Sequence, residues 1–201
     1  MISLADAPRP DGLRERKKAR TRAAIQHEAL RLFRLQGYDS TTTEQIAEAA
    51  EVAPSTLFRY FSSKEDLVLS DDYDPVIVDA ARAQPPDVGP VAAIREALRT
   101  VFRALGPEEI SDMYERVGLA LSVPDLRAAM LDQLAQTMHR IAEFIAERSD
   151  RPPDDFDAAT LAGAIVGVLI AAELHWVAHP DTDLISLIDS ALEHLESGLR
   201  P

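Results

Sequence analysis

Residues 41–67 constrain the fold of this chain most strongly, because their residue types follow the pattern of a helix, a tight turn and a second, shorter helix. The threonine run at 41–43 offers hydroxyl groups that can cap a helix, and Ile46 and Ala47 supply apolar groups for its inner face. Pro54 stands where the second helix would begin, and its missing N–H costs nothing in a first helical turn. The segment therefore predicts two packed helices, the second of about two turns.

The remainder of the chain predicts further helices and no sheet. Apolar residues recur three and four positions apart, and most segments begin with Pro or Asp, which favour the first turn of a helix. A group of Pro and Gly residues at 85–90 marks a loop. We expect an all-α protein of about nine helices. Besides the two packed helices, these are a helix capped by Ser62 and Ser63 and helices at 13–36, 91–105, 107–121, 124–148, 155–178 and 181–198.

Charge is divided unevenly along the chain. The net charge of −13 at pH 7 argues against a nucleic-acid partner, and residues 71–201 carry 24 acidic side chains against 10 basic ones. Residues 1–70, however, carry 11 basic and 10 acidic side chains, and residues 14–34 hold eight basic residues against two acidic ones. The N-terminal part can therefore approach phosphate groups that the rest of the chain would repel.

The composition excludes several classes of protein. The chain has no cysteine, which excludes disulfide bonds and thiolate metal sites. The N-terminus lacks the apolar stretch of a signal peptide. The longest uncharged stretch, 158–172, has 15 residues, fewer than the roughly 18 that a membrane span needs. We therefore expect a cytoplasmic protein without a membrane segment.

The helix pair at 41–67 supplies groups that bind DNA. The second helix of such a pair can enter the major groove, while hydroxyls, amines and helix N-termini bind the flanking phosphates. The guanidinium of Arg59 can form two hydrogen bonds with the edge of a guanine. The candidate phosphate contacts are Thr43, Ser55, Thr56, Tyr60 and Lys64.

Residues 14–70 also match a known sequence pattern at many positions. These are Ile46, Ala47, Ala50, Val52, Thr56, Leu57, Tyr60, Phe61, Lys64, Glu65 and Leu67, preceded by Arg22, Ala29, Leu32, Phe33, Gly37 and Tyr38. On these residues the segment resembles the DNA-binding domain of TetR-type regulators. The resemblance implies a ligand-responsive repressor that binds palindromic double-stranded operator DNA as a homodimer. It adds Arg22 and Phe58 to the candidate DNA contacts.

The sequence departs from that family pattern at several positions of the turn and the second helix. Glu51 stands where the family usually has Gly, so we expect a left-handed conformation there at a cost of about 1 kcal/mol. Ala53 replaces a common Ser cap, and Ser55 replaces a common Gly. Phe58 replaces a Tyr that commonly binds phosphate in the family, so we expect one phosphate hydrogen bond fewer than the family pattern implies.

The domain organisation follows from composition and from the resemblance together. Residues 1–12 hold Pro8, Pro10 and Gly12 and predict a mobile arm. Residues 13–70 form the expected helix–turn–helix domain, and residues 71–201 form the expected helical domain for ligand binding and dimerisation. The residues at 58–61 and 70–75 also resemble a branch of the family that senses fatty acyl-CoA-type ligands.

The last two predicted helices carry the candidate dimer interface. The helix at 155–178 has small residues four apart and is apolar nearly all round, so both of its sides must be covered. The helix at 181–198 is amphipathic, and two such pairs can form a four-helix interface around a twofold axis. The alternative is that both helices belong to the core of one chain. The candidate interface residues are Gly163, Gly167, Ala171, Leu184, Ile188, Leu192 and Leu195.

A candidate effector pocket is formed by aromatic, Met and aliphatic side chains, which line adaptable apolar cavities but also occur in ordinary cores. As a set they indicate a small, elongated apolar effector, and the acyl-CoA-type branch implies a fatty acyl-CoA. The candidate pocket residues are Phe102, Leu105, Met113, Val117, Leu121, Leu134, Met138, Ile141, Val166 and Trp176.

Two other classes of function remain open at this point. His175 and His179 stand four apart on one helix, a spacing that can hold a metal, so a metal-responsive sensor or a helical enzyme is the alternative reading. The sequence has no third ligand nearby, no Gly-rich phosphate loop and no nucleophile motif, so we expect no catalytic residue, metal or cofactor. A partner-binding dimer is the third class, although it gives no reason for the basic residues at 14–34.

Overall fold

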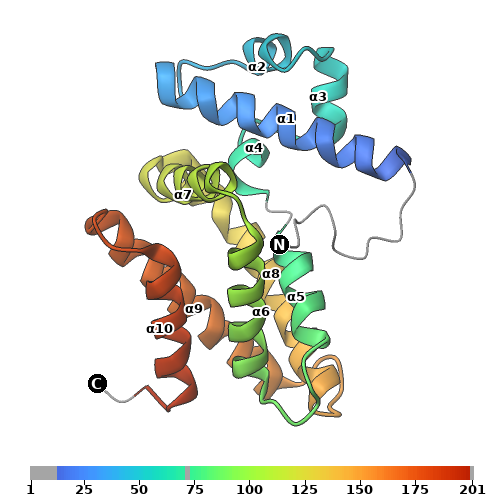
Figure 1. Ribbon diagram of the computed structural model, residues 1–201, viewed down its shortest axis with the longest axis vertical. Coiled ribbons are helices and arrows are strands. Elements are labelled where there is room, and N and C mark those ends of the chain that lie inside the picture. Colours follow the sequence, from blue (N-terminus) through green and yellow to red (C-terminus); the bar gives the residue numbers. More distant parts are fainter. Residues whose placement is uncertain (1–12, 71–72, 200–201) are drawn as a thin grey trace. The chain divides into compact units, whose positions relative to one another are not determined.

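The structure, a computed structural model, describes residues 13–70 and 73–199, with side chains from residue 17 onward, and these residues form helices and turns without a strand (Figure 1). The arm expected at 1–12 lies outside the described residues. The helices found in the described ranges are α1 (Leu13–Gln36), α2 (Thr43–Ala49), α3 (Pro54–Tyr60), α4 (Asp66–Leu69), α5 (Tyr73–Arg82), α6 (Pro90–Ala104), α7 (Pro107–Ser122), α8 (Pro124–Arg148), α9 (Phe156–Ala178) and α10 (Leu184–Glu196).

The described residues divide into two compact units. The first unit contains α1 to α4 together with residues 106–129, which hold α7 and the start of α8. The second unit contains α5, α6, the rest of α8, α9 and α10. The expected division into 13–70 and 71–201 differs from these units, because α7 packs against α1 and α4.

The turns of the first unit follow from individual residues. Gly37 ends α1 with a φ of 86°, a left-handed value that glycine adopts without strain. Thr42 caps α2, and its side chain and that of Gln45 satisfy each other's backbone N–H groups. Glu51 lies between α2 and α3 with a φ of 53°, so the left-handed conformation expected there is confirmed. Pro54 begins α3 as expected.

Unit 1 is built around the inner sides of its first three helices. Apolar residues spaced along α1, Ile46 of α2 and Leu57 of α3 are all buried, and α2 packs against both α1 and α3. The burial of Leu57 follows from helical periodicity, since it lies on the opposite side of α3 from Ser55 and Arg59. The core therefore fixes which side of α3 is left for solvent.

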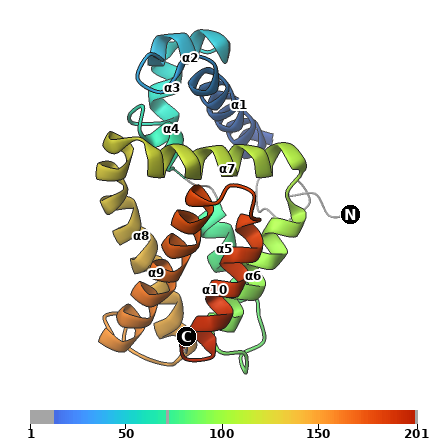
Figure 2. The ribbon, with the colours of Figure 1, turned by 90° about the vertical axis from the view of Figure 1, so that its left-hand side faces the viewer.

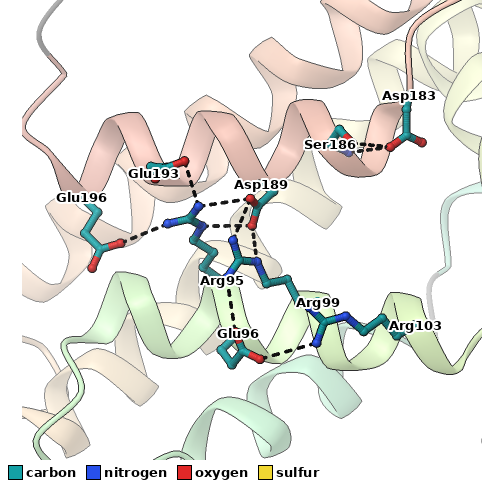
Figure 3. A network of polar contacts seen from close by, with 9 residues as sticks. All are labelled: Arg95, Glu96, Arg99, Arg103, Asp183, Ser186, Asp189, Glu193 and Glu196. Atoms are coloured by element: carbon teal, nitrogen blue, oxygen red, sulfur yellow. Dashed lines mark hydrogen bonds and ion pairs between the residues drawn. The ribbon is translucent and has the colours of Figure 1, made fainter.

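Unit 2 is held by apolar packing and by a partly buried group of charges. Helix α10 packs against α9 and α6 (Figure 2), and it buries Leu184, Ile188 and Leu192 within the chain. Between α6 and α10, the carboxylate of Asp189 accepts hydrogen bonds from Arg95 and Arg99 at 2.6–3.1 Å (Figure 3). This network ties the two helices together through Arg95 and Asp189, whose side chains are 13% and 26% exposed, and through the more exposed Arg99.

The segment 73–82 forms a helix that the sequence patterns did not indicate. Asp74 and Pro75 look like a helix breaker in the sequence, but in the structure they lie in the first turn of α5, where a proline is tolerated. The carboxylate of Asp74 accepts hydrogen bonds from Thr137 at 2.6 Å and from Arg140 at 2.7 Å, both on α8. These long-range partners stabilise a helix start that local pattern alone could not reveal.

Candidate DNA-binding site

The outer side of α3 is the central feature of the candidate site. Ser55, Phe58 and Arg59 are exposed there, three and four positions apart as helical periodicity requires. Thr56 and Tyr60 lie at the edges of this face and are half-buried. The guanidinium carbon of Arg59 lies 5.4 Å from the centre of the Tyr60 ring. The structure therefore brings five of the predicted DNA contacts together on one short helix.

Thr43 lies on the neighbouring helix, as the first residue of α2. Its hydroxyl is half-buried and contacts the carboxylate of Glu44 at 3.4 Å. The cap of α2 is Thr42, one residue earlier, so the hydroxyl of Thr43 is not used for capping. A hydroxyl at a helix N-terminus is well placed for a phosphate, because the backbone N–H groups there carry partial positive charge.

Lys64 is held against the turn that follows α1 by contacts with Tyr38. Its ammonium donates a hydrogen bond to the backbone carbonyl of Tyr38 and lies 4.1 Å from the centre of the Tyr38 ring. Burial raises the pKa of the Tyr38 phenol above its ordinary value, so the ring stays neutral beside the cation. A lysine positioned in this way keeps its charge at a fixed place beside α3.

Arg22 acts on the structure of the site itself. One of its terminal nitrogens donates a 2.9 Å hydrogen bond to the carbonyl of Tyr60, the last residue of α3, and its guanidinium lies 4.3 Å from the Phe61 ring. Gln26, one turn further along α1, donates to the carbonyls of Leu67 and Ser70 at 3.0 and 3.2 Å. Two neighbouring side chains of α1 therefore satisfy carbonyls at the ends of α3 and α4.

The role of Gln26 was missed by sequence reasoning, and its signal was weak. A glutamine on a helix surface is ordinary, and its two carbonyl partners lie more than 40 positions further along the chain. The sequence also contained no signal for two contacts between α1 and α7, the ion pair of Arg34 with Glu115 and the contact of His27 with Asp112. Such pairs depend on the packing of α7 against α1.

The predicted pocket residues do not gather in one unit. Met113, Val117 and Leu121 lie on α7 in the first unit, and the other seven lie in the second unit. Met138 borders an open hollow of about 680 Å³ that lies on α8, on residues 153–155 and on Ala159 of α9. Phe102 borders a second hollow, of about 420 Å³, together with Arg99 and Arg103 of α6 and residues of α10.

The predicted dimer residues divide into two groups. Leu184, Ile188 and Leu192 on α10 are 1%, 6% and 0% exposed within the single chain, so they form its own core and leave no surface for a partner. This corrects their assignment to the interface, because the amphipathic side of α10 is already covered by α6 and α9. Leu195 is half-buried on the same helix.

Helix α9 keeps the other group near the surface. Gly167 and Ala171 are exposed, and Leu174 is exposed one turn later. Gly163 is partly covered, because a Cβ at this position would lie 3.3 Å from the terminal methyl of Met138. By length and composition α9 could also cross a membrane, and only 22% of its most apolar 18-residue window is buried. An exposed apolar surface of this size on one helix indicates a site where another apolar surface binds.

His175 and His179 form a stacked pair at the end of α9, with ring centres 4.3 Å apart. The ring nitrogen Nδ1 of His179 lies 3.0 Å from the carbonyl oxygen of His175. Among the described residues, no group of three or more His, Asp or Glu side chains is arranged to hold a metal ion. The pair therefore provides two of the four ligands that a tetrahedral metal site needs.

A helix–turn–helix whose second helix presents a hydroxyl, a phenyl ring and a guanidinium to solvent defines a DNA-binding regulator. Comparison with known proteins agrees with this class. Residues 25–70 match the family model of bacterial regulatory proteins of the tetR family. Residues 88–200 match the model described as the MftR C-terminal domain.

Curated relatives cover nearly the whole chain. The HTH-type transcriptional regulator TcmR of Streptomyces glaucescens is 34% identical over 207 residues, which is 99% of this chain and 91% of the relative. The HTH-type transcriptional repressor KstR of Rhodococcus jostii is 26% identical, over 92% of this chain and 87% of the relative. The chain belongs to the TetR family, and it is a ligand-responsive transcriptional regulator that binds DNA.

Solved structures share the fold at lower identity. The fatty acid degradation regulator FadR of Bacillus halodurans superimposes with a TM-score of 0.60 at 22% identity, over 96% of this chain and 99% of that one. FadR of Thermus thermophilus, solved in complex with lauroyl-CoA, gives a TM-score of 0.53 at 23% identity, over 90% of this chain and 95% of that one. These two structures support the all-α fold.

Proposed function

We propose that this regulator is a repressor that binds a palindromic operator as a homodimer and leaves it when a small apolar or acyl-CoA-like effector binds. In this proposal residues 13–70 act as the DNA-binding domain, and residues 71–201 bind the effector and the second copy. The protein acts in the cytoplasm, as a regulator and not as an enzyme.

The observation that carries the DNA-binding part is the composition of the outer side of α3. A buried Leu57 turns Ser55 and Arg59 outward, where a hydroxyl can bind phosphate and a guanidinium can bind the O6 and N7 atoms of a guanine. Thr43 and Lys64 flank the helix with one hydroxyl and one fixed cation for the phosphates. Arg22 supports the site by holding the end of α3, and we assign it a positioning role.

Dimerisation is assigned to the exposed side of α9. Gly167 and Ala171 carry no bulky side chain, so the backbone of a second helix can approach closely, and Leu174 adds apolar surface. Covering this side with the same side of a second copy satisfies twofold symmetry, because each residue then meets the equivalent region of its partner. A dimer also doubles the DNA contacts, with its two recognition helices about 34–36 Å apart for successive major grooves.

The effector is assigned to the second unit on the chemistry of its surface. The hollow at Met138 is lined mainly by apolar side chains of α8 and α9, which suits an alkyl chain. The T. thermophilus relative binds lauroyl-CoA, which places this ligand class first for testing. An effector releases DNA only by binding the DNA-free state more tightly than the DNA-bound state.

Selection of bound duplexes from a random DNA library by the purified protein tests the proposal. We expect enrichment of a site with two inverted half-sites, and affinity that falls steeply as salt rises because phosphate contacts release counterions. Addition of lauroyl-CoA, with free coenzyme A as the matched control, should lower the affinity for that site. Failure to enrich any duplex would overturn the operator assignment, and an unchanged affinity would overturn the acyl-CoA assignment.

A further inference from the structure

Phe58 is an apolar side chain on a face otherwise made for polar ligands. Phe58 is 49% exposed, whereas the neighbouring Leu57 is fully buried in the core of unit 1. Among the described residues of that unit, the large apolar side chains that are exposed are Phe58 and Leu35, and Leu35 lies near the end of α1. On α3, Phe58 lies three residues after Ser55 and directly before Arg59.

The chemistry of a phenyl ring limits what Phe58 can contact on DNA. It has no hydrogen-bond donor or acceptor, so it cannot bind a phosphate oxygen or the polar edge of a base. In the major groove the exposed apolar group is the 5-methyl of thymine, and apolar side chains including Phe contact it. Placed against that methyl, the ring buries apolar surface that the free protein leaves in water.

We propose that Phe58 determines operator specificity by contacting the 5-methyl group of a thymine next to the base that Arg59 binds. The proposal rests on the DNA-binding function proposed above and names what its central face recognises. Phe58 and Arg59 are consecutive on α3, so their side chains lie about 100° apart around the helix and reach neighbouring base pairs. A guanine and a thymine close together in each half-site then form the recognised element.

The size of the effect follows from one methyl group. Removing a buried carbon group lowers affinity by about fourfold, so two symmetric half-sites together lose about fifteenfold. Replacement of thymine by uracil removes this methyl and leaves the base's hydrogen-bonding groups in place. Uracil-substituted operators therefore isolate the contact that we propose.

The experiment measures binding of the full-length dimer to the selected operator and to duplexes in which each symmetric thymine pair is replaced by uracil in turn. For the natural protein, we expect uracil at one thymine pair, next to the guanine that Arg59 binds, to lower operator affinity by about fifteenfold. The F58A protein should bind more weakly and should no longer distinguish thymine from uracil at that pair. The matched control L35A removes the other exposed apolar side chain and should keep the full distinction.

The outcomes separate this inference from the proposed function. A protein that binds no duplex contradicts the proposed function. A protein that binds its operator but tolerates uracil at every position contradicts the role of Phe58 alone, since the ring would then pack on the sugar–phosphate backbone. Retention of uracil sensitivity by F58A, with an unchanged thermal melting curve, would assign the methyl contact to another residue and also overturn the proposal.

Discussion

The outer sides of α3 and α9 both lie in solvent, but they are composed of different groups. On α3, one phenyl ring is set among a hydroxyl and a guanidinium, and nearby side chains of α1 fix the end of the helix. On α9, glycine, alanine and leucine form a nearly continuous apolar strip. The first surface suits a charged, hydrogen-bonding partner, and the second suits another apolar helix.

The two helices also differ in how much of their environment a single chain supplies. The position of α3 is set by buried Leu57 and by the hydrogen bond from Arg22, so the site is organised before DNA binds. Helix α9 has few charged side chains, and 22% of its most apolar 18-residue window is buried; in the proposed dimer a second copy supplies the remaining cover. Substitutions on the two helices should therefore affect different measurements.

The largest effect is expected from A171E, which places a carboxylate in the proposed interface. Because twofold symmetry brings two such charges into an apolar contact, we expect the dimer to weaken by more than about a hundredfold, measured by sedimentation equilibrium. The control A128E adds the same charge at an exposed position of α8 and should leave the dimer intact. A dimer that survives A171E would remove α9 from the interface.

R59A tests the polar half of the comparison. Loss of a bidentate contact with guanine in each half-site should reduce operator affinity by about a hundredfold, with the dimer unchanged, as measured by fluorescence anisotropy. R31A is the control, since Arg31 is an exposed arginine of α1 paired with Glu28, and it should change affinity by less than about twofold. Equal losses from both variants would indicate general electrostatics in place of base recognition.

D189N tests the contrast between α9 and its neighbour α10, because the Asp189 carboxylate of α10 is bound by Arg95 and Arg99 of α6. Arg95 and Arg99 hold the pKa of the Asp189 carboxyl well below its usual range, so the carboxylate stabilises the folded state above about pH 4 and this contribution is lost as the pH falls further. At pH 7 we expect D189N to lower the free energy of unfolding by about 2 kcal/mol, measured with urea.

Two comparisons check the Asp189 prediction. The difference in free energy of unfolding between D189N and the natural protein should stay constant from about pH 5 to 8. It should narrow below about pH 4, because protonation of the Asp189 carboxylate removes the same charge that the substitution removes. E147Q breaks the exposed ion pair with Arg82 and should cost less than about 0.5 kcal/mol. A difference that grows as the pH falls would contradict the assigned pKa direction.

The smallest effect is expected at the turn that positions α3. Because Glu51 has a φ of 53°, E51G should relieve the left-handed strain and raise the free energy of unfolding by about 0.5 kcal/mol after the added flexibility of the unfolded chain is counted. E48G, within α2, should instead lower it by about 1 kcal/mol. Thermal melting of both variants gives the two signs, and a loss of stability in E51G would show that the turn is unstrained.

The sequence predicted best what local residues decide. The cap at Thr42, the start of α3 at Pro54, the end of α1 at Gly37 and the left-handed Glu51 each depend on neighbours within a few positions. The outward face of α3 followed from helical periodicity once Leu57 was assigned to the core. Short-range geometry and residue type were enough for these features.

Features that depend on partners distant in sequence could not be predicted. Gln26 contacts carbonyls that only folding brings near, and α8 supplies hydrogen-bond partners for Asp74 in the first turn of α5, where Pro75 also lies. The amphipathic pattern of α10 was compatible with a chain core or with a dimer, and packing against α6 and α9 decided in favour of the core. Periodicity identifies a side to be buried but not the surface that buries it.

The number of chains bound to one operator duplex tests the central claim most directly, because it joins the two surfaces in one measurement. Sedimentation velocity with a labelled duplex, at protein concentrations spanning the binding transition, gives this stoichiometry. The account predicts two chains on each pair of half-sites, with A171E losing the complex although its α3 is intact. A complex of one chain per duplex, formed equally well by the natural protein and by A171E, would contradict it.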